Sequence, residues 1–177
     1  MINLLLFLSF LKFFRFIIFF MLFGLSLNTV MATARVHSST MPLNKCITAA
    51  ADYHGVNPYL LRAILVVESQ LNPKAININT NGTRDIGVAQ INSIHLPVLQ
   101  SHGIKENHLM DGCVNTYVGA WLLRKQIARY GMNWFGVAAY HSVTPSKNFR
   151  YQVLVYNEMV RSGAIQNVAM VVPKLQK

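Results

Sequence analysis

The chain of 177 residues is long enough for one domain with a substantial core, and it is strongly basic. Its 16 Lys and Arg residues outnumber its 6 Asp and Glu residues by ten, which favours nucleic acid, an anionic membrane surface or an anionic cell-wall polymer as partner. Charge alone does not choose among these partners, but the absence of a nucleic-acid recognition motif argues against nucleic acid.

The N-terminal segment differs in character from the rest of the chain. Lys12 and Arg15 precede an apolar run over residues 16–27, and small residues follow it. This order predicts a secretory signal peptide over residues 1–34. The alternative is an uncleaved anchor, although the charge-free run is shorter than the roughly 20 apolar residues that span a bilayer. Both interpretations predict export, to the periplasm after cleavage or to an inner-membrane-anchored state without it.

The chain contains two cysteines, Cys46 and Cys113. In an oxidising compartment, an even pair predicts a disulfide, which would stabilise the fold by roughly 4 kcal/mol on the chain-entropy model. The alternative is two buried free thiols. Neither cysteine belongs to a CxxC motif, so zinc binding and thiol redox chemistry are poor interpretations.

From Met41 onward, hydrophobic periodicity and helix start and stop signals predict helices joined by loops. Asn57 and Asp111 are expected N-caps, and Gly131 is an expected stop. The predicted helices cover residues 44–55, 57–70, 93–103 with an interruption at Pro97, 111–131, 133–142 and 147–163. Residues 74–92 are polar and contain an Asn-Gly turn signal, which predicts a long loop with a small hairpin. We therefore expect a single all-α domain over residues 41–163, followed by a tail over residues 164–177.

Glu68 is the most informative carboxylate because it follows the apolar run "AILVV". At 3.6 residues per turn, the stripe formed by Leu60, Leu61, Ile64 and Leu65 continues onto Glu68. Burial and the C-terminal end of a helix both raise a carboxyl pKa, and a protonated Glu is a suitable general acid. The alternative is that the helix frays here and that Glu68 faces solvent.

The other carboxylates offer poor partners for an acid at this position. They are Asp52, Asp85, Glu106, Asp111 and Glu158. Only Asp85, on the long loop, is a plausible second catalytic carboxylate, and a turn or arginine-pairing role suits it better. The histidines show neither HxH nor HExxH spacing, so no metal site and no cofactor are expected. The residues alone thus favour single-acid chemistry on a neutral or polar polymer.

An ordered set of motifs resembles the lytic transglycosylases with a goose-lysozyme-like fold, especially small exported members of secretion and conjugation systems. The set comprises "ES" at Glu68-Ser69, then "NPKA", "DIGVAQIN", "VGAWLL" and "AAYHS". The resemblance covers residues 43–159. Val88 and Ala89 depart from the family's Leu-Met, which implies looser packing over the glycan, and His141 departs from its Asn.

The resemblance implies a lysozyme-like domain that cleaves peptidoglycan between N-acetylmuramic acid and N-acetylglucosamine. Glu68 would protonate the glycosidic oxygen and then accept the proton of the muramoyl C6 hydroxyl, which closes a 1,6-anhydro ring without water. Ser69, Gln90, Tyr140 and His141 would contact the substrate. The implied partners are glycan strands and the proteins of a secretion or conjugation apparatus. The alternatives are a lysozyme-type hydrolase and a non-catalytic glycan-binding assembly component.

Overall fold

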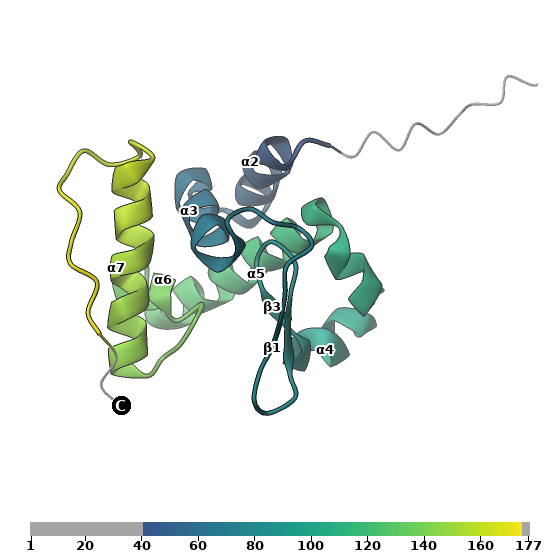
Figure 1. Cartoon of the computed structure of the whole chain (residues 1–177). Coiled ribbons are helices and arrows are strands. Elements are labelled where there is room, and N and C mark those ends of the chain that lie inside the picture. Colours follow the sequence, from purple (N-terminus) through teal and green to yellow (C-terminus); the bar gives the residue numbers. More distant parts are fainter. Residues whose placement is uncertain (1–40, 175–177) are drawn as a thin grey trace, which may run out of the picture. The chain divides into compact units, whose positions relative to one another are not determined.

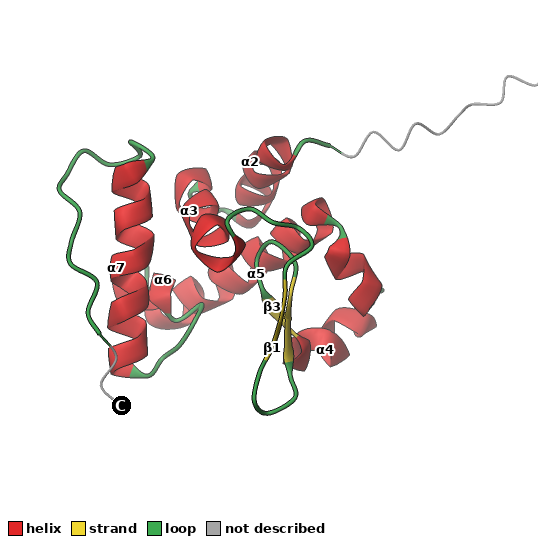
Figure 2. Cartoon of the chain, in the orientation of Figure 1, coloured by secondary structure: helices red, strands yellow, loops and turns green. Residues whose placement is uncertain are grey.

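The structure is a computed structural model that describes residues 41–174, so the expected signal peptide or anchor over residues 1–34 lies outside the described residues. Helices dominate the described part, and its short strands form one small sheet (Figure 2). The helices are α2 (Leu43–His54), α3 (Pro58–Ser69), α4 (Leu96–Ser101), α5 (Gly112–Tyr130), α6 (Trp134–Ala138) and α7 (Pro145–Arg161), with 3-10 turns η1 (Ser93–His95) and η2 (Glu106–Met110). The predicted helical class is confirmed.

The two strongest helices begin as the sequence predicts. The Asn57 side chain accepts hydrogen bonds from the backbone N–H groups of Tyr59 (2.9 Å) and Leu60 (3.0 Å) at the start of α3. The Asp111 side chain likewise accepts hydrogen bonds from the backbone N–H groups of Cys113 and Val114 at the start of α5. These caps satisfy backbone donors that have no partner within a helix, and they set where each helix begins.

Helix α5 is the centre of the domain, since it packs against α2, α3 and α6 (Figure 1). A disulfide between Cys46 and Cys113, with Cα atoms 5.2 Å apart, joins α2 to the first turn of α5. The stripe predicted on α3 is buried, and Leu61 and Ile64 have no exposed surface. Full burial of each such side chain contributes about 1.5–3 kcal/mol to the stability of the fold. The buried stripe therefore holds α3 against the core.

The predicted hairpin is part of a three-stranded antiparallel sheet with the order β1 (Ile76–Ile78), β2 (Arg84–Ile86), β3 (Ile91–Asn92). The register pairs Ile76 with Ile86, and Asp85 with Asn92. This sheet connects α3 to α4. The loop between β2 and β3 lies next to the C-terminal end of α3, where the Ser69 hydroxyl donates a hydrogen bond to the carbonyl of Val88.

Two segments refine the prediction. Pro97 does not interrupt a helix; it lies in the first turn of α4, directly after η1, where its missing N–H group is not needed. The tail over residues 164–174 contains no helix or strand and runs back beside α7 (Figure 1). Asn157 holds it through two 2.7 Å hydrogen bonds with the backbone of Met170.

Within residues 41–174, no helix has both the length and the hydrophobicity that a bilayer crossing requires.

Candidate active site

Glu68 lies in the last turn of α3 and points toward α7. Its side chain is half-buried, and its Oε1 atom accepts a 2.6 Å hydrogen bond from the hydroxyl of Tyr151. The helix ends one residue later, at Ser69, and the next residue, Gln70, adopts the left-handed conformation with φ 56°. Glu68 therefore extends the buried stripe of α3 into the contact between α3 and α7, as the periodicity predicts.

The surroundings of Glu68 change its acidity. Burial raises the pKa of the Glu68 carboxyl from 4.5 to about 7, the hydrogen bond from Tyr151 opposes the rise, and the negative charge of Asp85 supports it. At neutral pH, a carboxyl with a pKa near 7 exists in both its protonated and its ionised form. It can therefore donate a proton in one step and accept one in the next.

The loop of residues 86–90, which we call the site loop, is held by side chains that the sequence singled out. The Ser69 hydroxyl donates to the carbonyl of Val88 (2.8 Å), and the Tyr140 hydroxyl donates to the carbonyl of Ala89 (2.7 Å). The Gln90 amide donates back to the carbonyl of Gly87 (2.9 Å). Three expected substrate contacts thus share a second role, because each of them fixes the backbone beside Glu68.

Asn115 is the main site residue that sequence reasoning missed. It is fully buried in α5 and donates to the carbonyls of Ile86 (2.8 Å) and Leu109 (2.9 Å), while its own oxygen accepts from the N–H of Ala89 (2.7 Å). Gly87 lies directly against it at φ 75°, and a Cβ there would overlap the Asn115 amide. The sequence did offer one indication of its role. An asparagine lies inside a predicted helix, although asparagine has a low helix propensity.

The departures from the family motif in the site loop are core residues. Val88 and Ala89 have no exposed surface, so their side chains pack under the loop rather than over a glycan. Ala89 meets α5 at Gly119, where an added Cβ would come within 2.7 Å of the Ala89 Cβ and 3.4 Å of the Tyr140 hydroxyl. The small residues therefore allow α5, the site loop and Tyr140 to approach one another closely.

His141 and Tyr151 form one side of the site, and Tyr151 belongs to α7. Their rings stack with centroids 4.8 Å apart and an interplanar angle of 5°. Desolvation and the charge of Lys147 lower the pKa of His141, and Asp85 opposes this. Burial and the adjacent Glu68 charge raise the pKa of Tyr151, so its phenol stays protonated and can donate. Tyr151 was also missed, although its position on the buried stripe of the last helix was visible.

Asp85 is held within the sheet, and no arginine among residues 41–174 pairs with it. Its carboxylate accepts hydrogen bonds from the side-chain amides of Asn92 (2.7 Å), Asn79 (3.0 Å) and Asn77 (3.2 Å). Arginine pairing occurs instead at the neighbouring position, where Arg84 binds Glu106. In the described part of the chain, no group of three His, Cys, Asp or Glu side chains has a geometry that could hold a metal ion.

Known bacterial proteins are similar in sequence to this chain. "Invasion protein IagB" of Salmonella typhi is 38% identical over 103 residues, which cover 58% of this chain and 64% of that protein. "Protein IpgF" of Shigella flexneri is 32% identical over 124 residues, or 67% of this chain and 82% of that protein. "X polypeptide" of Escherichia coli is 37% identical over 98 residues, or 55% and 58%.

The chain thus spans less than two thirds of the length of the Salmonella and Escherichia relatives. A family model described as "Transglycosylase SLT domain" matches residues 45–152, which include α3, the site loop and the first half of α7. The chain therefore belongs to the transglycosylase SLT domain family.

Proposed function

We propose that this protein is a lytic transglycosylase that cleaves the β-1,4 bond between N-acetylmuramic acid and N-acetylglucosamine in peptidoglycan. The observation that carries the proposal is the Glu68 carboxyl, half-buried, held by Tyr151 and with a pKa of about 7. Membership of the transglycosylase SLT domain family supports the same reaction class.

Glu68 performs both proton transfers in the proposed mechanism. Its protonated form gives a proton to the glycosidic oxygen as the bond to the muramoyl C1 breaks. The C6 hydroxyl of the same sugar attacks C1, and its proton passes to the ionised Glu68, which returns to its starting state. The products are a 1,6-anhydro-muramoyl end and a free 4-hydroxyl on N-acetylglucosamine, so no water is consumed.

The environment of Asp85 supports a lyase over a hydrolase. A glycosidase usually needs a second carboxylate that activates water or forms a covalent intermediate. The Asp85 carboxylate already accepts three amide hydrogen bonds within the sheet. A reaction in which the substrate supplies its own nucleophile needs only one catalytic carboxyl.

The remaining site residues have supporting roles in the proposal. Ser69, Gln90 and Tyr140 hold the site loop in place, and their exposed atoms face the glycan next to Glu68. His141 packs on Tyr151 and contributes a wall of the sugar-binding surface. None of these residues exchanges a proton with the substrate.

The biological setting follows from the same proposal. Residues 1–34 direct export, residues 41–163 form the catalytic domain, and the Cys46–Cys113 disulfide suits an oxidising periplasm. The proposed role is to open the wall locally for a secretion or conjugation apparatus; the relative from Salmonella typhi is named for invasion.

Digestion of purified sacculi in heavy-oxygen water tests the reaction. We expect unlabelled fragments that end in 1,6-anhydro-muramic acid. Label in new muramic acid ends, with fragments heavier by one water, would show a lysozyme-type hydrolase instead. Binding of sacculi without any released fragment would show a non-catalytic component.

A further inference from the structure

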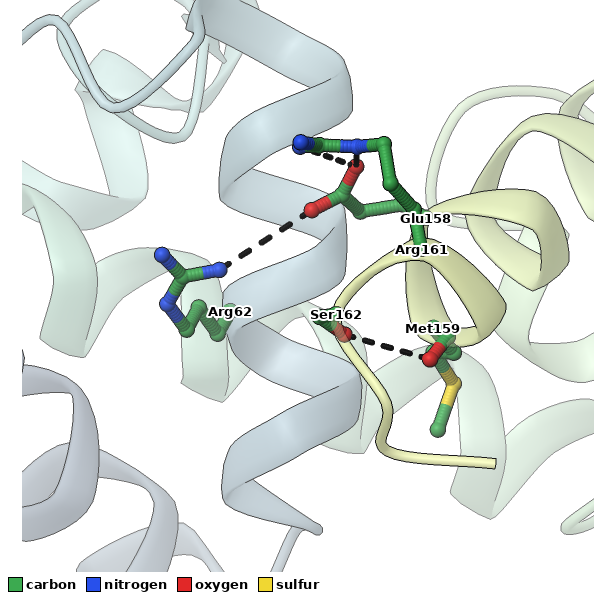
Figure 3. A network of polar contacts seen from close by, with 5 residues as sticks. All are labelled: Arg62, Glu158, Met159, Arg161 and Ser162. Carbon is green, nitrogen blue, oxygen red and sulfur yellow. Dashed lines mark hydrogen bonds and ion pairs between the residues drawn. The ribbon is translucent and has the colours of Figure 1, made fainter. Parts of the chain in front are cut away.

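A pocket of about 670 Å³ lies between α3 and α7, and Glu68 is not among its lining residues. Arg62, Val66 and Gln70 contribute to it from one stripe of α3, about half a helical turn away from Glu68. From α7 it receives Glu158 and Arg161. Figure 3 shows these charged side chains meeting across the two helices.

The pocket contains an unpaired buried acceptor. Glu158 is 7% exposed, and its Oε2 atom accepts a 2.7 Å hydrogen bond from Nε of Arg161 and forms an ion pair with Nη2 of the same residue at 2.6 Å. Its Oε1 atom has no hydrogen-bond partner among residues 41–174, and its nearest cation is Arg62 Nη1 at 3.9 Å (Figure 3). Buried carboxylate oxygens are normally hydrogen-bonded, so Oε1 is a position for a donor supplied from outside.

The charges and walls of the pocket define what would fit. Two guanidinium groups and one carboxylate leave a net charge of +1, which suits a ligand with a single carboxylate. Oε1 of Glu158 requires an N–H or O–H donor close to that carboxylate. The apolar part of the wall, formed by Val66, Val67, Leu71 and Leu154, suits a short aliphatic side chain.

We propose that this pocket binds the carboxy-terminal end of a peptide with a small aliphatic last residue, the chemistry found at the D-alanyl end of peptidoglycan stem peptides. Arg62 and Arg161 bind the terminal carboxylate, and the last amide N–H donates to Glu158. This assignment deepens the proposed function, on which it rests for the identity of the polymer.

Calorimetric titration of the exported protein with N-acetyl-D-alanyl-D-alanine tests the proposal. We expect saturable binding that weakens at least about tenfold in Arg62→Ala and in Arg161→Ala, because each removes a charged hydrogen bond. Arg124→Ala, an exposed arginine on α5, removes the same charge elsewhere and should bind like the wild type.

Two altered probes separate the proposed contacts. The C-terminally amidated peptide lacks the carboxylate, and N-acetyl-D-alanyl-D-lactate has the same charge and shape but lacks the last N–H. Both should bind at least about tenfold more weakly than the parent peptide. Equal binding of the lactate probe, or equal losses in all three arginine variants, would overturn the assignment.

The proposal also fails if the wild type shows no binding of the parent peptide. This outcome is distinct from failure of the proposed function, because Glu68→Gln should bind the peptide normally while losing sacculus cleavage. If the wild type binds the peptide but cleaves no glycan, the assignment of the pocket stands and the proposed enzymatic activity is refuted.

Discussion

The Tyr151 hydroxyl donates a 2.6 Å hydrogen bond to Oε1 of Glu68, and this contact joins α7 to the last turn of α3. It fixes the direction of the carboxyl and opposes the rise of its pKa that burial causes. Burial is the main cause of the raised pKa, while the orientation of the proposed acid and part of its acidity depend on a residue 83 positions away in the chain.

Glu68→Gln should abolish cleavage of sacculi while the protein stays folded. Glutamine is nearly isosteric with glutamate and can still accept the hydrogen bond from Tyr151, but it neither donates nor accepts the catalytic proton. The turbidity of a sacculus suspension measures activity, and circular dichroism verifies the fold.

Glu106→Gln is the matched control, because Glu106 is an exposed carboxylate paired with Arg84 away from the site. It should retain full activity. An equally active Glu68→Gln variant would refute the assignment of the acid.

Tyr151→Phe should move the alkaline limb of the pH–activity profile to higher pH. The Tyr151 hydrogen bond favours the ionised carboxylate, so its loss leaves burial unopposed and raises the pKa of Glu68 above about 7. Loss of orientation should also reduce maximal activity roughly 10–100-fold, the equivalent of one hydrogen bond to a charged group. Tyr156→Phe, on the same helix, should leave the profile unchanged; a parallel shift in both variants would contradict the prediction.

The raised pKa of Glu68 also predicts a pH dependence of folding stability. The pKa of the Glu68 carboxyl is about 7 in the folded protein, and its reference value is 4.5. Between these two pH values the carboxyl keeps its proton in the folded protein but has lost it in the unfolded chain. This contribution to stability is complete below pH 4.5 and is lost as pH rises to about 7. Melting temperatures of wild type and Glu68→Gln should therefore diverge over this range, with the wild type falling relative to the variant. Parallel curves would show that the Glu68 pKa is not raised.

The disulfide between Cys46 and Cys113 should contribute roughly 4 kcal/mol to the free energy of unfolding, because it closes a long loop. Urea unfolding of the wild type and of the double variant Cys46→Ala/Cys113→Ala measures this contribution. Alkylation of natively exported protein, followed by mass measurement with and without reductant, should detect thiols only after reduction. Two alkylated cysteines without reductant would contradict the prediction.

The sequence predicted most helices because caps and breakers act locally. Asn57 and Asp111 accept hydrogen bonds from N–H groups two and three residues ahead, so their effect is visible in a short window. The stripe on α3 likewise indicated where Glu68 points. Pro97 was misjudged because a proline inside a helix and a proline in its first turn differ only in where the helix starts.

The contacts that complete the site could not be predicted in the same way. Tyr151 reaches Glu68, and Tyr140 reaches Ala89, across sequence separations of 83 and 51 residues. No periodicity encodes such pairs, since they depend on how α3, α5 and α7 pack. The use of Ser69 as an anchor for the site loop was hidden for the same reason.

Asn115→Ala should show how strongly the site depends on its loop. The substitution removes the partner of two carbonyls and one N–H in the buried interior, and each unsatisfied group costs about 1–3 kcal/mol. We expect a loss of about 3 kcal/mol or more in the free energy of unfolding. Activity should fall further than the unfolded fraction explains, because residues 86–90 are no longer held against α5.

Thr116→Val provides the control, since Thr116 is equally buried on α5 but its hydroxyl donates to the carbonyl of Gly112 within the same helix. It should lower stability without a separate loss of activity. Both variants are assayed at a temperature where unfolding curves show each to be folded. If Asn115→Ala then cleaves sacculi at the wild-type rate, the site loop does not need this anchor. If only Asn115→Ala is impaired, the position of residues 86–90 relative to Glu68 limits the reaction.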